Sequence, residues 1–255
     1  MTAREAEIIE LIRKEVKPAL GCTEPIAVAL AVAKAMETVE EKCGLSGPDW
    51  RMEGAYSLCI EVSGNILKNG MGVGIPGTGM VGLHIAAALG AVCGKSSYGL
   101  EVLNDLDEDS IAKAKEMVEA KDVTVGLAET DHKLYVKATV LCKDGHSACA
   151  VIEDDHDNIV ETWFDHAQLT SSHKCEGADA AAQKSTLDYK LTVKEIVDFA
   201  STVAYEDIEF ILESRTLNMA LAEEGMKGCY GLKVGWAINL SDNREVFGGD
   251  FLCYA

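Results

Sequence analysis

A short segment between two helix-like stretches carries the residues best suited to chemistry. It runs from Val16 to Pro25 and contains a thiol at Cys22 and a carboxylate at Glu24. Thr23 is a suitable N-cap for the second helix, and a proline is well tolerated at the first positions after a cap. Cys22 is therefore expected at a helix N-terminus, where exposed N–H groups and the helix dipole favour the thiolate. Such a thiolate can ligate a metal or act as a nucleophile, although no histidine stands in a recognisable partner motif.

A glycine-rich segment is the second candidate. Seven glycines fall between residues 64 and 82, which is more than a plain connector needs. Such a loop lets the backbone approach a ligand, and Lys68 could supply charge. A helix is expected from residue 80 to residue 92, so Gly77–Gly79 would lie at its N-terminus and could hold a carboxylate. The segment lacks a nucleotide-binding loop motif, and a structural turn without a ligand explains the same residues.

His156 is the third candidate. It is flanked by Asp154, Asp155 and Asp157. This group could be a weak metal site, but an acidic surface turn explains it equally well.

Composition narrows the class of protein. The 255 residues include 42 acidic and 23 basic side chains, and the net charge of -19 argues against binding to nucleic acid or to anionic membranes. No apolar run is long enough to span a bilayer, and the N-terminus does not resemble a secretory signal. The nine cysteines are an odd number without C-x-x-C spacing, which favours free thiols in a reducing cytoplasm.

Hydrophobic periodicity predicts an α+β fold. The expected helices are 4–17, 26–42, 80–92, 109–120, 192–204 and 205–224. A strand is expected over 51–63, and several more between 121 and 160, with a hairpin turn at Lys143–His146. The segment 170–185 is the best linker candidate. Thr192 and Glu195 form a capping box at the start of a helix.

These elements suggest two domains. Helical N- and C-terminal segments, 1–49 and 170–255, are expected to pack together as a domain that is incomplete at its C-terminus. The region 50–169 is expected to be a mixed α/β insert that contains an antiparallel sheet and the glycine-rich loop.

Four stretches, taken in order, resemble a known family. They are Glu15–Pro25, then Asn65–Gly70 with Pro76–Met80, then His156–Val160, and then Phe210–Gly225. The chain resembles the L-cysteine desulfidase family of bacteria and archaea, which includes uncharacterised proteins of the UPF0597 type. That family is related to the α domain of iron–sulfur L-serine dehydratases.

The resemblance implies a carbon–sulfur lyase that splits L-cysteine into sulfide, ammonia and pyruvate. It also implies a 4Fe–4S cluster held by three cysteines, with Cys22 as the first ligand and one iron open as a Lewis acid. Lys68 or His156 could be the base. The implied substrate-binding residues are Glu24, Asn65, Lys68, Asn69, Gly77, Thr78 and Gly79.

The resemblance is to the N-terminal part of longer proteins, and Cys229 and Cys253 do not match the other two cluster ligands. The chain is therefore expected to be a truncated gene product or one subunit of a split enzyme, inactive alone, which needs a C-terminal half or partner chain. A homodimer is also open. The alternatives are a non-catalytic fragment or binding subunit, and a lyase of the iron–sulfur L-serine dehydratase type.

Overall fold

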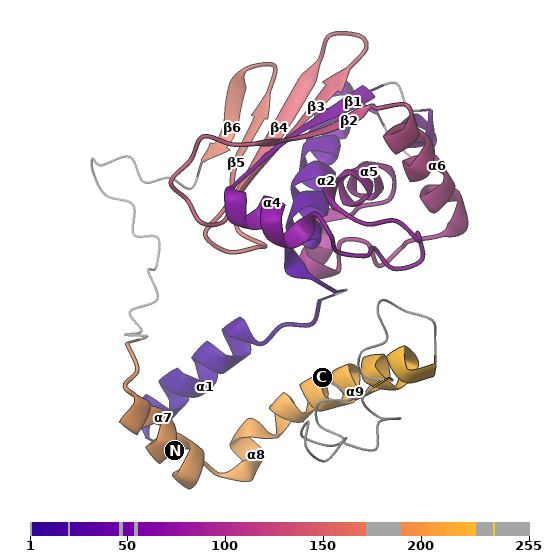
Figure 1. The fold of residues 1–255 in the computed structure, drawn as a ribbon. Coiled ribbons are helices and arrows are strands. Elements are labelled where there is room, and N and C mark those ends of the chain that lie inside the picture. The colour runs from indigo at the N-terminus through magenta and orange to yellow at the C-terminus, as the bar shows by residue number, and fades with distance from the viewer. Residues whose placement is uncertain are drawn as a thin grey trace, which may run out of the picture. The chain divides into compact units, whose positions relative to one another are not determined.

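A computed structural model describes residues 2–19, 21–45, 48–53, 56–171, 190–227 and 237. The chain forms two compact units (Figure 1). One comprises Pro18–Ala180, and the other comprises Met1–Lys17 with Ala181–Ala255. In the described part of the chain, no helix is long and apolar enough to cross a membrane.

The first unit is built on a six-stranded mixed sheet of order β2-β1-β3-β4-β5-β6. Its strands are β1 (Tyr56–Val62), β2 (Val123–Leu127), β3 (Tyr135–Cys142), β4 (Ser147–Glu153), β5 (Ile159–Phe164) and β6 (Ala167–Ser171). Every neighbouring pair is antiparallel except β1 and β2, which are parallel. A parallel pair needs a long crossover, and the chain between β1 and β2 supplies one that is mostly helical.

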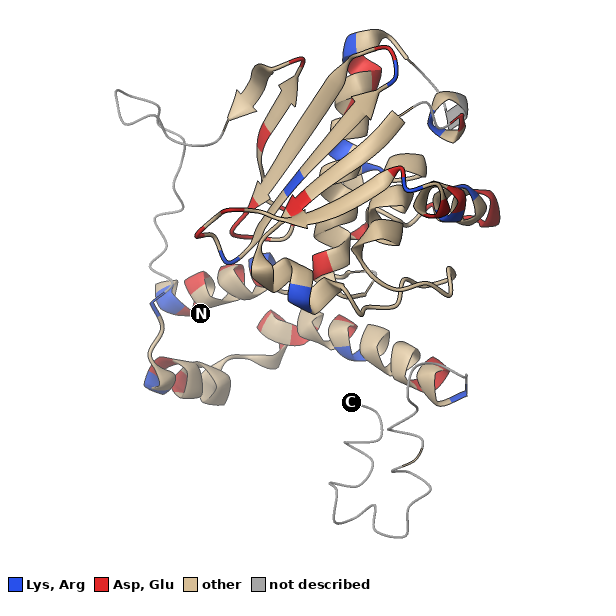
Figure 2. Cartoon of the chain, turned by 45° about the horizontal axis from the view of Figure 1, so that its top comes forward, with Lys and Arg blue, Asp and Glu red and all other residues tan. Residues whose placement is uncertain are grey.

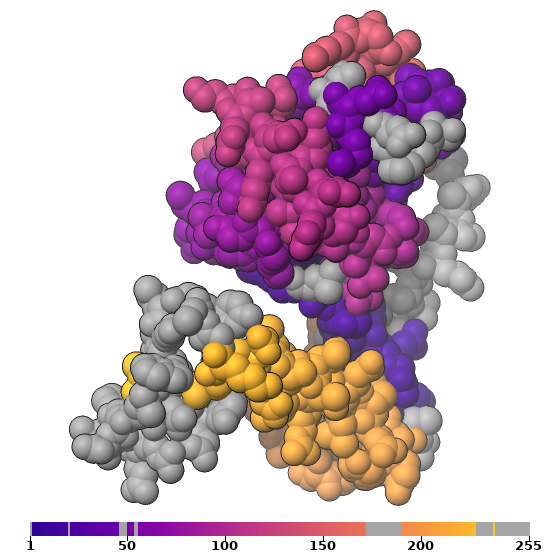
Figure 3. Space-filling view, turned by 90° about the vertical axis from the view of Figure 1, so that its right-hand side faces the viewer, coloured from indigo at the N-terminus to yellow at the C-terminus, as the bar shows by residue number. Residues whose placement is uncertain are grey.

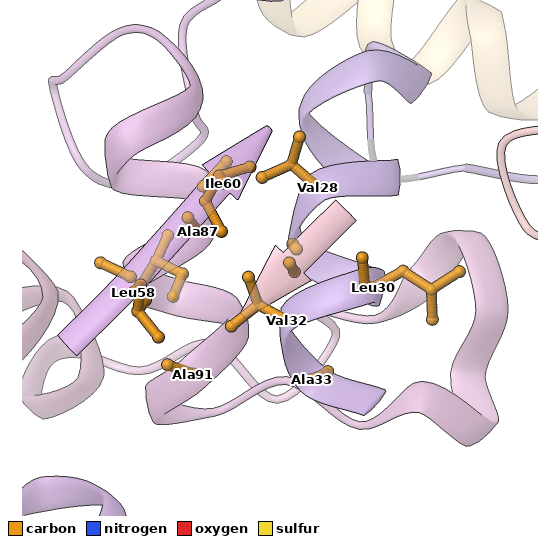
Figure 4. Close-up of a cluster of buried hydrophobic side chains, with 14 of the residues drawn as sticks. Val28, Leu30, Val32, Ala33, Leu58, Ile60, Ala87 and Ala91 are labelled. Carbon is orange, nitrogen blue, oxygen red and sulfur yellow. The ribbon is translucent and has the colours of Figure 1, made fainter. Parts of the chain in front are cut away.

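Helices cover one face of this sheet. They are α2 (Thr23–Cys43), α5 (Leu83–Val92) and, beside α5, α6 (Glu108–Glu119). The first half of α2 is apolar on all sides, as the sequence indicates, and each residue from 26 to 33 is at most 4% exposed. Figure 4 shows Val28 and Val32 of α2 near Leu58 and Ile60 of β1, with Ala87 and other small residues of α5 close by. This cluster is the core.

Buried and half-buried residues alternate along the strands, so one face of the sheet is apolar and the other carries more polar side chains. Along β1, Leu58 and Ile60 are buried, whereas Cys59 and Glu61 are half-buried and point the other way. Glu61 pairs there with Lys137 of β3, with 2.9 Å between the charged atoms. Among the described elements of this unit, helices cover only one face, and Figure 2 marks in colour where charged residues occur along the strands.

Two local expectations are wrong. The strand expected over 51–63 begins only at Tyr56, because Pro48–Met52 form the short helix α3. Arg51 holds this helix in place: its guanidinium donates to both carboxylate oxygens of Glu40, at 2.6 and 2.7 Å, and to the Gly94 carbonyl. The first part of the glycine-rich segment is also not a loop, since Gly64–Gly70 form α4.

The second unit is helical in its described part. It contains α1 (Ala3–Glu15), α7 (Val193–Thr202), α8 (Tyr205–Ile208), the 3-10 turn η2 (Glu209–Ile211) and α9 (Leu212–Lys227). The capping box at Thr192 is confirmed, but the single helix expected over 205–224 is divided into three pieces.

The first helix of the chain contacts the helices that follow residue 190. Arg4 of α1 pairs with Glu195 of α7 at 3.2 Å, and the Arg13 guanidinium lies 3.7 Å from the centre of the Phe210 ring. The α+β fold class is confirmed. Residues 18–49 group with the sheet in the structure, and the full division into domains stays a prediction. Most of the expected linker, from residue 172 onward, lies outside the described residues.

Close contact between α2 and α5 leads to a first prediction. A Cβ added at Gly90 of α5 would lie 2.4 Å from the Ala29 carbonyl oxygen of α2. Gly90→Ala should therefore force the helices apart and lower the free energy of unfolding by about 1–3 kcal/mol, although alanine favours a helix by about 1 kcal/mol. Urea denaturation followed by circular dichroism measures the loss.

Gly126→Ala is the matched control, because a Cβ at Gly126 in β2 meets nothing within 4 Å. It should change the free energy of unfolding by less than about 0.5 kcal/mol. Equal losses in both variants would contradict the close approach of the two helices.

Candidate functional site

Cys22 itself caps the start of α2. The expected cap was Thr23, but Thr23 is the first helical residue and Cys22 has the extended backbone of an N-cap, with φ −63° and ψ 129°. Its side chain makes no capping hydrogen bond. The thiol is exposed and instead donates to the Glu24 carboxylate, with 2.7 Å between Sγ and Oε2.

Glu24 is held from two sides. Its Oε2 accepts from Cys22, and its Oε1 accepts from the Asn69 side-chain amide of α4 at 3.0 Å. Partial burial opposes ionisation, but the hydrogen bonds from Cys22 and Asn69 outweigh it, so the pKa of Glu24 is lowered. The carboxylate is therefore charged at neutral pH and fixed in orientation.

The pKa of the Cys22 thiol is shifted in the opposite direction to that of Glu24. The pKa of Cys22 is raised, first by desolvation and then by its hydrogen bond to the Glu24 carboxylate. The expectation that the helix end favours a thiolate is wrong for this structure. Burial and the neighbouring carboxylate together stabilise the protonated thiol and outweigh the N–H groups at the start of α2.

A glycine allows α4 to approach α2. A Cβ at Gly70 would lie 2.4 Å from Leu83 Cδ2 and 3.6 Å from Glu24 Cβ. Since Gly70 directly follows Asn69, this narrow space lets α4 carry the Asn69 amide to the carboxylate.

His156 is half-buried in the turn between β4 and β5, and in its protonated form it makes a minor contribution to the lowered pKa of Glu24. Hydrogen bonds bring together Cys22, Glu24 and Asn69, which come from two separate parts of the sequence.

The other candidate residues lie apart from this carboxylate or inside a turn. Asn65 and Lys68 are exposed on α4, where Asn69 is the residue that bonds to Glu24. Thr78 is 3% exposed, and its hydroxyl donates to the Ile75 carbonyl at 2.7 Å and accepts from the Met80 N–H.

Gly77 and Gly79 have φ angles of +76° and +66°, which glycine adopts without strain. They form the tip of a small hairpin closed by the Gly74–Val81 bridge. The expectation that Gly77–Gly79 lie at a helix N-terminus is wrong, because α5 begins only at Leu83. Figure 3 shows the side of the unit where this purple region and the magenta α6 meet the surface.

A small pocket adjoins Cys22 on its other side. Its volume is about 220 Å³, and most of its lining is apolar. The lining residues are Gly21, Cys22, Pro25, Ile26, Val73, Gly74, Ile75, Pro76, Leu103, Asn104 and Leu106. Sequence reasoning missed Asn104 and its neighbours, because nothing in the pattern of that turn connects it to α2.

The side chains near Cys22 can be compared with those that a metal cofactor would need. Within the described residues, no group of three or more His, Cys, Asp or Glu side chains could hold a metal ion. Cys22 is exposed and lies against an apolar pocket, so it fits the part of a single thiolate ligand. Any further ligands would have to come from residues outside the described ranges or from another polypeptide.

The fold and the site define an α+β protein with a thiol–carboxylate pair beside an apolar pocket. Nearly the whole chain is similar to bacterial proteins named UPF0597. The relative from Phocaeicola vulgatus is 42% identical over 241 residues, which cover 94% of this chain and 52% of the relative. Relatives from Shewanella pealeana and Dichelobacter nodosus are 40% and 39% identical, and the match covers 54% of each.

The chain spans about half the length of these curated relatives. The names of these relatives agree with the UPF0597 part of the family resemblance and state no activity. No family model matches the chain, and no solved structure matches it.

Removal of the Glu24 charge should activate the thiol. The Glu24→Gln variant loses the anion that stabilises the protonated form, so the pKa of Cys22 should fall and more thiolate should be present at neutral pH. Alkylation of Cys22 by iodoacetamide should then be about three- to tenfold faster. Peptide mass spectrometry over a pH series measures this rate separately from the other thiols.

Glu129→Gln is the control, since it removes one exposed carboxylate from the loop before β3. Equal acceleration in both variants would mean that overall charge, and not the Cys22–Glu24 pair, sets the reactivity.

The amide of Asn69 should keep Glu24 ionised. Asn69→Asp replaces a donor by a second carboxylate, so the pKa of Glu24 should rise. A lowered folded-state pKa contributes stability above the unfolded pKa, and this is lost as the pH falls through the folded value. The variant should therefore begin to lose stability at higher pH than the wild type. NMR titration of the side-chain carboxyl carbon reports the pKa.

Asn65→Asp on the same helix is the control and should leave the titration of Glu24 nearly unchanged. A Glu24 curve that is identical in all three proteins would rule out the role of Asn69.

Proposed function

We propose that this chain is the thiolate-bearing half of an iron–sulfur L-cysteine desulfidase. The observation that supports the proposal is the hydrogen-bonded group of Cys22, Glu24 and Asn69 beside an apolar pocket. These residues fall in the stretches that resemble the desulfidase signature. A bound cluster would supply Lewis-acid chemistry at one open iron, and Cys22 would be one of its ligands.

Cys22 must lose its proton before it can ligate a metal. Metal sites require thiolates, so their assembly releases protons. Glu24 accepts the hydrogen bond of this thiol at 2.7 Å and its lowered pKa keeps it ionised, so the proton of Cys22 would leave to solvent. Asn69 keeps Glu24 in position through its 3.0 Å hydrogen bond.

The elimination then needs a base, and it needs groups that bind the ammonium and carboxylate ends of L-cysteine. A base takes the Cα proton, the C–H electron pair forms the Cα–Cβ double bond, and the Cβ–S bond breaks to release sulfide. The resulting 2-aminoacrylate hydrolyses to pyruvate and ammonia. We assign the base to His156 or Lys68, because both lie in the stretches that resemble the desulfidase signature. The Glu24 carboxylate suits the α-ammonium group of the substrate.

The remaining ligands are assigned to the half of the relatives that this chain does not match. The chain would then be inactive alone and would act on L-cysteine only together with that half, as a continuous chain or as a partner. Two alternatives are kept. One is a non-catalytic fragment or binding subunit, which is compatible with a match to only about half of each relative. The other is a lyase of the L-serine dehydratase type.

Anaerobic reconstitution with iron and sulfide tests the proposal. The chain should be co-expressed with the unmatched half of the Phocaeicola vulgatus relative. The loaded complex should absorb broadly near the blue-violet edge and release sulfide and pyruvate from L-cysteine. The Cys22→Ala complex should lose at least about 100-fold in activity, as expected when a ligand is removed, together with most of the absorption.

Each other outcome has a defined meaning. A loaded complex that releases no sulfide from L-cysteine refutes the desulfidase, and pyruvate formed from L-serine alone points to the dehydratase. Full absorption in Cys22→Ala refutes the ligand role. Co-expressed Cys59→Ala is the control for loss of a thiol, since Cys59 lies on the opposite face of β1 from the core.

A further inference from the structure

The helices after residue 190 expose an unusual amount of apolar surface. Within the described residues, none of α7, α8 or α9 contains a buried residue. Several of their large apolar side chains are instead widely exposed: Val193 (77%), Ile196 (50%), Val197 (57%), Tyr205 (55%), Leu217 (50%) and Leu221 (71%). These helices, orange to yellow, form a visible surface in Figure 3.

On α7 the exposed residues form a regular stripe. Val193, Ile196 and Val197 are spaced i, i+3 and i+4, so they lie on one face of the helix. We call these three residues the α7 stripe. Glu195 points elsewhere, because it bonds to Arg4 of α1. Thus α7 has a side that contacts α1 and a separate apolar side.

A contiguous apolar stripe is the usual mark of a helix that packs on another element. In the described part of this unit, the only buried apolar residues are Ile8 and Ile9 of α1. The helices α7–α9 therefore form with almost no core of their own. On α9, Leu217 and Leu221 are spaced i and i+4 and are also exposed.

The length of the UPF0597 relatives points to a partner for this apolar surface. The match to the Phocaeicola vulgatus relative covers 241 of the 255 residues, so it includes α7–α9, yet it covers only 52% of that relative. In the relatives, these helices thus belong to a polypeptide about twice as long. We propose that the α7 stripe, with Leu217 and Leu221 of α9, is the docking surface for a polypeptide equivalent to that unmatched half.

The charges near this surface indicate which residues the partner should carry around its contact surface. The helices α8 to α9 carry acidic residues next to the apolar ones: Glu206, Asp207, Glu209, Glu213, Glu223 and Glu224. The partner should offer an aliphatic surface at the centre and lysine or arginine around it. This docking surface does not depend on which reaction the site performs.

Co-purification tests the surface. The full 255-residue chain, carrying an affinity tag, should be co-expressed with the untagged unmatched half of the Phocaeicola vulgatus relative. The wild type should retain that half, and Val193→Asp and Val197→Asp should each retain at least about tenfold less, because a charge would enter an apolar contact. Both positions are exposed, so circular dichroism should show unchanged helix content.

Leu127→Asp is the matched control. Leu127 is 64% exposed but lies on β2, in the other compact unit, so this variant should retain the partner as the wild type does. Equal losses in all three variants, or no retention by the wild type, would overturn the proposal. It would also be overturned if the 255-residue chain alone were a dimer by light scattering that Val197→Asp dissociates, since a second copy would then be the occupant.

Discussion

The packing of α2 against α5 and the sheet is the constraint on which the rest of the first unit depends. Thirteen of the 21 residues of α2 are buried, and Gly90 lets α5 come so close that a methyl group would meet the Ala29 carbonyl. A helix fixed so firmly along its length has a fixed beginning. Cys22 and Glu24 are therefore positioned by the core, although they lie at its edge.

The site at that edge combines opposing electrostatic effects. The helix N-terminus favours negative charge, and Glu24 already supplies it with the help of Asn69. Desolvation and this same negative charge raise the pKa of the Cys22 thiol. In the function proposed above, a cation bound to Cys22 would reverse this balance, since it would attract both the thiolate and the carboxylate.

Sequence patterns could predict the parts of the fold that local chemistry decides. The all-round apolar character of α2 predicted its burial, and the spacing of Thr192 and Glu195 predicted a capped helix. They could not predict that Gly64–Gly70 are helical. The two glycines of that segment lie at its ends, where they cost a short helix little, and close packing of Gly70 against Leu83 stabilises it.

The same distinction applies to the site. Cys22 and Glu24 are two residues apart, and their proximity follows from the sequence. The contact between Glu24 and Asn69 joins residues that are 45 positions apart and exists because α4 follows β1 back toward the start of α2. Asn104 carried no signal at all, since a turn residue joins a pocket only through the tertiary fold.

The two units differ in how much of their apolar surface is buried. The first unit buries a continuous core and presents one thiol at its edge. The described helices of the second unit bury almost nothing, while relatives about twice as long retain nearly the whole sequence. The two proposals meet at this point: a polypeptide that packs on α7–α9 would, in the proposed function, also carry the further ligands of the cluster.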